Sequence, residues 1–414
     1  MLSIHFQVLT ISGVWCPNHS SSVQRIFYKC YSFIVVVLMY SLALSQLARI
    51  IFVKQSFNEF NDTFFISLST NFACFKAASN LVNQKQIVSL VNMFKHNCCL
   101  AHNDSERSIQ KQYNDSCSKI IISLLILVET SAFFVVVAPL CGTMDNQDLP
   151  YQVLLPYDLS NKLCYWLTFV HHSLGAVLFT AISITNDAVI TGFMMHVCGQ
   201  LSILQHRLVL LSRSLANDVS KKGRTTDFDI MLERDWLRQI VYHQNHISNI
   251  AKKICWTFNE IVICQFCISG LEICVSVYQL SVRNNNTVEL CTYAIYLMVM
   301  LGQFFVYCYF GNEVTLQSKI THRAIFDMDW TSFSLSLKKD LTLIMLYSSK
   351  PIAMSCGPFV HLTLESFTNV KFHFKQLPFK IILFLAVVDY SEHFFLFQIL
   401  KTSYSIFSVL KTTT

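Results

Sequence analysis

The side chains of this chain that could act as acids or bases mostly lie inside apolar stretches, and Glu129 is the clearest case. It lies near the middle of the apolar stretch 119–140, where an ionised carboxylate is costly. One interpretation makes Glu129 a contact for a ligand or for gating. We favour the other, in which the carboxylate faces the interior of a helix bundle, either protonated or paired with a lysine such as Lys76.

Histidines form two pairs that could bind a metal ion. His171 and His172 lie among the aromatic residues 165–169, and His243 and His246 lie in a polar helix with Gln and Asn neighbours. A metal site needs further ligands at suitable spacing, and the sequence shows none beside either pair. We therefore assign the first pair to a pocket or to packing, and we predict no metal site at the second.

Cys264 and Cys267 have the CxxC spacing of redox and metal sites. They lie in the middle of an apolar stretch, however, so we interpret them as packing residues. The chain has no P-loop, HExxH, GxSxG or paired-carboxylate motif. It also has no basic cluster with interleaved aromatic residues. We predict neither an enzyme, nor a bound cofactor, nor a nucleic-acid partner.

The amino-acid composition indicates which kind of structural element holds these side chains. Of 414 residues 53% are hydrophobic and only 14% are charged, whereas a soluble domain carries about 25% charged residues. Only 10 glycines and 7 prolines are present, which is unlike a loop-rich β fold or a disordered chain. The chain is predicted to be an all-α, polytopic membrane protein that contacts lipid.

A helix needs about 20 mostly apolar residues to cross the hydrocarbon layer. Seven segments meet this condition in one transmembrane domain that covers residues 1–414. The predicted spans are 28–52, 61–83, 119–140, 163–185, 258–280, 289–311, and 352–369 continuing at 399–411. The stretch from 186 to 257 is predicted as a long loop with a polar helix.

Lys and Arg are distributed unevenly between the two sides of these spans. The N-terminal segment and the loops after spans two, four and six carry 21 of them, and the alternate loops carry four. Cytoplasmic loops are enriched in Lys and Arg. We therefore predict a cytoplasmic N-terminus and an extracellular C-terminus, which disfavours a G-protein-coupled receptor. Asn61 and Asn285 lie in outer sequons and are glycosylation candidates.

Four stretches carry a resemblance to a known family. They are 155–208, with an LPY start, an acidic residue near the inner end of its span and an HVCGQL run; 237–280, with QFCIS; 302–330, with GQFFVYCYFGN and DMDW; and 341–367 joined to the tail ILKTSYSIFSVLK. In this order they resemble the insect odorant receptors, over most of the chain beyond about residue 150.

The resemblance implies a seven-helix receptor of the plasma membrane of olfactory sensory neurons, acting in olfactory signalling. It implies a ligand-gated, non-selective cation channel, formed as a heteromer, expected to be tetrameric, with a common co-receptor subunit and opened by volatile small molecules. The second cytoplasmic loop lacks the long insertion expected of the co-receptor, so the chain is expected to be the ligand-tuning subunit. A gustatory-type receptor channel is the alternative.

Candidate site residues follow from the spans and from the resemblance. Aromatic and apolar side chains in the outer halves of the spans are candidates for a ligand pocket, although each is individually more typical of packing: Phe72, Phe75, Phe133, Phe134, Val137, Tyr165, Phe169, Tyr293 and Tyr296. The resemblance places the pore in the last helix, where Ile406 and Leu410 share one face and are the gate candidates. Ser403 and Tyr404 are their candidate neighbours.

Residues 370–398 depart from the family pattern. The segment is rich in Phe, Leu, Ile and Lys, and Val370-Lys371 and Phe397-Gln398 can be encoded by sequences that resemble splice sites. Excising it joins Asn369 to Ile399 in one continuous helical span. We interpret 370–398 as a retained intron, and the alternative is an isoform that the insert makes non-functional.

Overall fold

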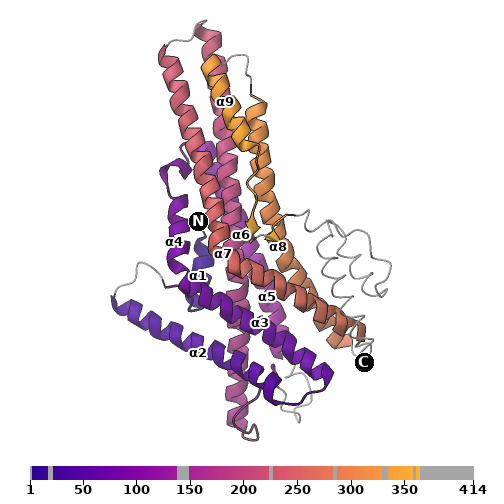
Figure 1. Cartoon of the computed structure of the whole chain (residues 1–414). Coiled ribbons are helices and arrows are strands. Elements are labelled where there is room, and N and C mark those ends of the chain that lie inside the picture. Colours follow the sequence, from indigo (N-terminus) through magenta and orange to yellow (C-terminus); the bar gives the residue numbers. More distant parts are fainter. Residues whose placement is uncertain are drawn as a thin grey trace.

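A computed structural model of the chain describes residues 2–16, 22–137, 149–222, 227–282, 287–328, 334–357 and 360–363. These residues are almost entirely helical (Figure 1), which confirms the predicted all-α fold. The elements are α1 (Ser3–Ile11), α2 (Ser22–Phe52), α3 (Phe57–Val82), α4 (Gln84–Phe94), the 3₁₀ turn η1 (Asn97–Cys99), α5 (Asp104–Val137), α6 (Lys162–Lys222), α7 (Asp227–Val282), α8 (Thr287–Phe326), α9 (Leu335–Ser348), β1 (Ser355–Cys356) and β2 (Val360–His361).

Five of the described helices are long and apolar enough to cross a membrane. They are α2, α5 and large parts of α6, α7 and α8. The second predicted span falls on α3, which carries more polar side chains than these five. Its start differs from the predicted residue 61, because Ser56 and Glu59 form a reciprocal capping box that begins the helix at Phe57.

Helices α6 and α7 extend well beyond the predicted spans. With 61 residues, α6 is about 90 Å long, three times the thickness of the hydrocarbon layer. The predicted long loop from 186 to 257 is therefore wrong for the described residues, which continue both helices. The reason is an apolar stripe at helical spacing, whose buried residues pack in one core between α6 and α7: Leu201, Leu204, Leu208, Leu211, Leu237, Ile240, Ile247 and Ile254.

The extended helices form a second region of the molecule. In Figure 1 the C-terminal half of α6, the N-terminal half of α7 and α9 occupy the upper part, and α2 and α3 cross the lower part. The core of the upper region also takes in α1, α4 and the end of α8. The upper region is the side on which Lys and Arg are concentrated, so it is the predicted cytoplasmic side.

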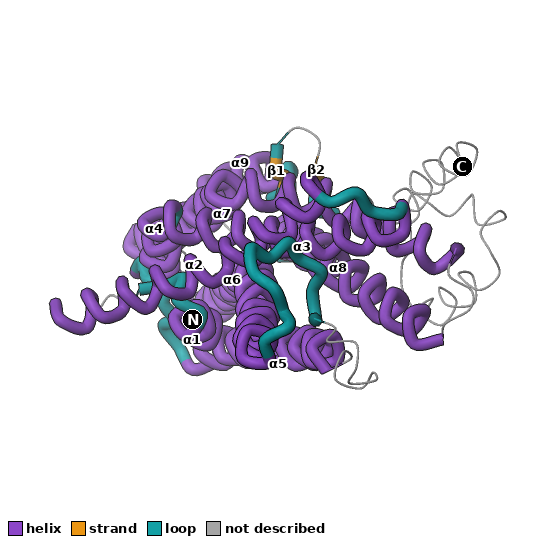
Figure 2. The backbone as a smooth tube through the Cα atoms, turned by 90° about the horizontal axis from the view of Figure 1, so that it is seen from below, coloured by secondary structure: helices purple, strands orange, loops and turns teal. Residues whose placement is uncertain are grey.

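The predicted seventh span does not begin as a helix at residue 352. The described residues 351–354 belong to neither a helix nor a strand, and Ser355 and Cys356 pair antiparallel with His361 and Val360. Figure 2 shows this hairpin at the edge of the helical bundle. Pro351 lacks a backbone N–H, and Gly357 has a φ of 64°, a conformation that favours glycine. Hydropathy alone does not register these two interruptions.

Candidate functional site

A buried ion pair joins α3 to α6. The Lys76 Nζ lies 2.7 and 2.9 Å from the two carboxylate oxygens of Asp187 and 3.0 Å from the Ser183 hydroxyl. From α8, the Tyr307 hydroxyl donates to Asp187 at 2.7 Å, and the Gln303 amide donates to the same carboxylate. These five residues, the inner network, hold three helices together. Every strong donor of the network is directed at one carboxylate, as expected for a charge far from water.

Asp187, and not Glu129, is therefore the partner of Lys76. Glu129 accepts a hydrogen bond from the Thr180 hydroxyl at 3.0 Å, between α5 and α6. Of the two forms predicted for Glu129, protonated or paired with a lysine, the pairing with Lys76 is wrong, because α3 presents Lys76 to the turn of α6 that carries Asp187. The sequence did hold a signal, since Asp187 is the acidic residue of the 155–208 motif.

A second polar cluster joins α3, α7 and α8. The Ser69 hydroxyl donates to the Glu272 carboxylate and shares a hydrogen bond with the Tyr296 hydroxyl. The Phe65 ring packs on the Tyr296 ring with 4.1 Å between centroids. Glu272 is only 2% exposed. These four residues are the outer cluster, because α3, α7 and α8 place them in the half of the bundle predicted to face outward.

Tyr296 was predicted from the sequence as a pocket residue, whereas Ser69 and Glu272 were not. The available signal was Glu272, which is a carboxylate in an apolar span and so as costly as Glu129. Ser69 has no such signal, because serine is ordinary in a helical span. Only the approach of α3 to α7 and α8 makes it part of the site.

The other predicted pocket residues have different surroundings. Phe72 is buried, and the Lys76 ammonium lies 4.7 Å from its ring centroid. Phe169 is buried against the half-buried Tyr165. Three of the predicted residues have exposed side chains: Phe75, Phe133 and Phe134. Val137 is half-buried. The Tyr293 side chain lies outside the described residues.

The two neighbouring histidines of α6 have separate roles in the structure. The His171 Nε2 lies 3.0 Å from the Ser41 hydroxyl and 3.2 Å from the Leu38 carbonyl, so it packs against α2. His172 is 1% exposed beside the ring of Tyr151. Among the described residues its Nδ1 has no hydrogen-bond partner. A ligand with a polar group could satisfy that atom, so His172 joins the candidate pocket residues.

Of the remaining predicted site residues, Asn61 is the one that lies within the described residues. Asn61 lies in α3 with 9% of its surface exposed, and Asn285 lies outside the described residues. The gate candidates Ile406 and Leu410, their neighbours Ser403 and Tyr404, and the segment 370–398 also lie outside the described residues.

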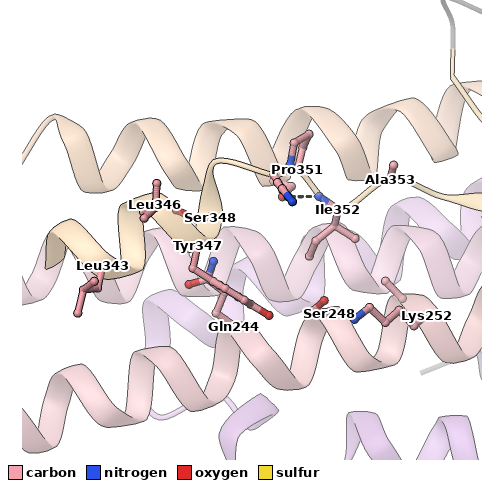
Figure 3. Close-up of a pocket in the computed structure, with 13 residues that line it drawn as sticks. Gln244, Ser248, Lys252, Leu343, Leu346, Tyr347, Ser348, Pro351, Ile352 and Ala353 are labelled. Carbon is pink, nitrogen blue, oxygen red and sulfur yellow. Dashed lines mark hydrogen bonds between the residues drawn. The ribbon is translucent and has the colours of Figure 1, made fainter. Parts of the chain in front are cut away.

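A cavity of about 640 Å³ lies between α7, α9 and the segment that follows α9. Figure 3 shows Gln244, Ser248 and Lys252 of α7 along one side of it, and Tyr347 and Ile352 along the other. The backbone N–H of Ile352 donates to the Ser318 hydroxyl at 3.0 Å, which fixes the segment against α8. The cavity shares no lining residue with the inner network or the outer cluster.

Comparison with known sequences decides the family. The model of the 7tm odorant receptor family matches residues 56–371, about three quarters of the chain. The chain belongs to the insect odorant receptor family. This receptor is 23% identical to odorant receptor 13a of Drosophila melanogaster over 70% of its own length and 71% of that protein. It is 24% identical to odorant receptor 46a, isoform B, of the same fly over 88% and 93%.

The receptor also shares the fold of a solved odorant receptor. Olfactory receptor OR5 from Machilis hrabei, in complex with eugenol, superposes with a TM-score of 0.75 at 16% identity, covering 100% of this chain and 98% of that chain. A second structure of OR5 from Machilis hrabei gives a TM-score of 0.74. The chain belongs to a family of receptors, which confirms the prediction that it is not an enzyme. The match also confirms the predicted multi-pass, all-α membrane fold.

Proposed function

We propose that this receptor is the ligand-tuning subunit of a ligand-gated, non-selective cation channel, assembled with a common co-receptor subunit into a heteromer, expected to be tetrameric. Its ligands are volatile small molecules. The outer cluster supports this function best, since it combines an aromatic wall with a few directed polar groups. Pockets for small ligands have this composition. OR5, which shares the fold, was solved with the small phenol eugenol.

The ligand site lies between α3, α7 and α8, at Ser69, Glu272 and Tyr296. The Tyr296 and Phe65 rings supply apolar surface, and the hydroxyls of Ser69 and Tyr296 and the Glu272 carboxylate supply hydrogen-bonding groups. His172 of α6 offers a further polar atom without a partner among the described residues. A volatile molecule with one hydroxyl or carbonyl fits this chemistry.

The outer cluster and the inner network suggest how ligand binding is coupled to the opening of the pore. Tyr296 of the outer cluster and Tyr307 of the inner network lie on the same helix, about 16 Å apart along its axis. A ligand that binds better when α8 shifts against α3 favours that arrangement by differential affinity. Ile406 and Leu410 then close the pore by dewetting in the resting state, with Ser403 and Tyr404 beside them.

Co-expression tests the proposal. Cells that express this chain together with an odorant co-receptor should give odorant-evoked cation currents, and cells that express either subunit alone should give none for the ligands of this chain. A current from this chain alone would favour the gustatory-type alternative. No current with any volatile, in cells where both subunits reach the surface, would contradict the proposal.

We also propose an orientation of the chain in the membrane and a location in the cell. The Lys and Arg distribution supports a cytoplasmic N-terminus and an extracellular C-terminus, in the plasma membrane of olfactory sensory neurons. An N-terminal epitope should be labelled only after permeabilisation, with a C-terminal epitope as the matched control. Labelling of the N-terminus on intact cells would overturn the orientation.

We also infer that residues 370–398 are a retained intron. The family match ends at residue 371, immediately after the segment begins, which supports this boundary. Sequencing of spliced transcripts from antennae should show Asn369 joined to Ile399. If nearly all transcripts contain the segment, it is part of the protein and the inference is wrong.

A further inference from the structure

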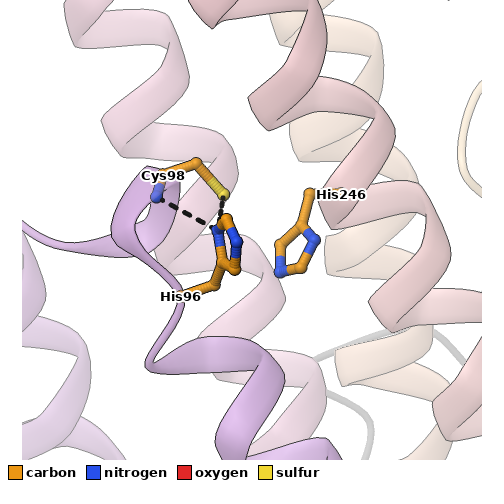
Figure 4. Close-up of side chains that lie close together, drawn as sticks. All are labelled: His96, Cys98 and His246. Carbon is orange, nitrogen blue, oxygen red and sulfur yellow. Dashed lines mark hydrogen bonds between the residues drawn. The ribbon is translucent and has the colours of Figure 1, made fainter.

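Three metal-binding side chains meet on the predicted cytoplasmic side, outside the site just described. His96 precedes η1, Cys98 lies within it, and His246 lies on α7 (Figure 4). One ligand atom from each lies within 4.8 Å of the others. Their positions in the sequence do not group them, because His246 is far from the other two along the chain.

The distances suit a metal ion of the size and preference of zinc. The Cys98 Sγ lies 3.3 Å from the His96 Nδ1. Two such ligands bound to one tetrahedral zinc ion are about 3.5 Å apart, given the usual Zn–S and Zn–N bond lengths. Figure 4 shows the His96 ring between the other two side chains, and its centroid is 4.9 Å from that of His246. The ligand atom of His246 lies within 4.8 Å of the other two, so its ring must move closer to them to complete the set.

Backbone and neighbouring side chains hold the three ligands in place. Arg207 of α6 donates to the carbonyl oxygens of Cys98 and Leu100, both at 2.8 Å, which fixes the η1 segment. The Tyr242 ring stacks on His246 and packs on His96. The ligands are therefore presented by an ordered framework before any metal binds.

A fourth ligand atom is already next to the cluster. The His246 Nε2 lies 2.9 Å from the Met93 carbonyl oxygen, to which it donates a hydrogen bond. Metal binding through Nε2 moves this proton to Nδ1 and leaves the carbonyl oxygen beside the ion. The Cys98 thiol releases its proton to water, so that the sulfur binds as thiolate.

We propose that His96, Cys98 and His246 form a binding site for one zinc ion, with the Met93 carbonyl or a water molecule as fourth ligand. The ion links the segment between α4 and α5 to α7, two parts of the predicted cytoplasmic region that lie far apart in the sequence. It thereby restrains α7, whose other half carries Glu272 of the outer cluster. The binding site itself does not depend on the function proposed above.

Zinc titration of the full-length receptor, purified in detergent and freed of metal with a chelator, tests the site. We expect one tight equivalent of Zn²⁺ by calorimetry. Each of Cys98→Ser and His246→Ala should weaken binding at this site by at least about tenfold. Cys30→Ser and His322→Ala are the matched controls, an exposed cysteine and a half-buried histidine elsewhere, and should keep it.

Cobalt gives a second readout that reports the ligands directly. Co²⁺ bound at the site should show a thiolate-to-cobalt charge-transfer band and tetrahedral ligand-field bands, and Cys98→Ser should remove the charge-transfer band. Each variant must elute as a single species in size-exclusion chromatography. An unchanged zinc affinity or cobalt spectrum in folded Cys98→Ser, or no tight equivalent in the unsubstituted chain, would overturn the proposal.

Discussion

Lys76 of α3 and Asp187 of α6 form an ion pair from which solvent is excluded, with 0% and 5% of their side chains exposed. Their charges compensate each other in a place where neither is stable alone. Because Tyr307 and Gln303 of α8 donate to the same carboxylate, the pair also fixes α8. The membrane half of the receptor thus has a polar centre that connects three helices.

Removing one partner of this pair should destabilise the receptor strongly. Lys76→Met leaves the Asp187 carboxylate buried without its cation, which costs about 3–5 kcal/mol. The double variant Lys76→Met with Asp187→Leu removes both charges and should recover much of the loss. The thermal midpoint of the purified receptor measures both effects. A double variant no more stable than Lys76→Met would contradict this account of the pair.

Glu129 should behave independently of Lys76. Glu129→Gln keeps an oxygen that accepts the Thr180 hydrogen bond, so we expect a small change in the thermal midpoint. Combined with Lys76→Met, the two effects should add to within about 0.5 kcal/mol, as for sites that share no partner. Coupling well above that value would mean that the two residues do interact.

The Tyr296 hydroxyl should contribute to ligand selectivity. Tyr296→Phe keeps the ring on Phe65 but removes the hydrogen-bonding group. The half-maximal concentration for odorants with a hydroxyl or carbonyl should rise by about tenfold, the equivalent of one hydrogen bond, and that for hydrocarbon odorants should change little. Tyr309→Phe, on the exposed side of the same helix, is the control. Equal shifts for both odorant classes would argue against a direct contact.

Arg207 should be essential for the predicted cytoplasmic region. Its Nε and Nη2 donate to the Glu106 carboxylate at 3.0 and 2.9 Å, while its other contacts hold η1. Arg207→Lys cannot reproduce this planar, bidentate geometry. We expect it to lower the thermal midpoint nearly as far as Arg207→Ala, a loss of about 3 kcal/mol for a buried charge pair. Full stability of the lysine variant would show that charge alone suffices.

Polar substitutions at the gate should make the channel leak. If Ile406 and Leu410 close the pore by dewetting, Ile406→Ser or Leu410→Ser admits water and raises the basal current of cells that also express the co-receptor. Leu400→Ser is the matched control, because Leu400 lies neither three nor four residues from either gate candidate and so falls off that helical face. Whole-cell recording without odorant distinguishes the three. An equal rise with Leu400→Ser would place the gate elsewhere.

The class of fold and the family follow from the amino-acid sequence alone. Low charge and long apolar runs specify membrane helices whatever their neighbours are, because each span must satisfy its own backbone hydrogen bonds in lipid. The motifs from 155 onward predicted the odorant receptors, and the family match confirms them. The spacing of Leu201, Leu204, Leu208 and Leu211 also held the signal for the long α6 helix, which hydropathy alone did not reveal.

Which polar side chains contact each other depends on the packing of the helices. Lys76 could have paired with Glu129 or Asp187, and the rotation and crossing of α3 against α6 selected Asp187. The packing of α6 against α2 places His171 beside the Ser41 hydroxyl, and the approach of α7 to η1 places His246 beside His96. A sequence records positions along single helices, whereas contacts between helices depend on their relative rotation and depth, which packing of the whole bundle sets.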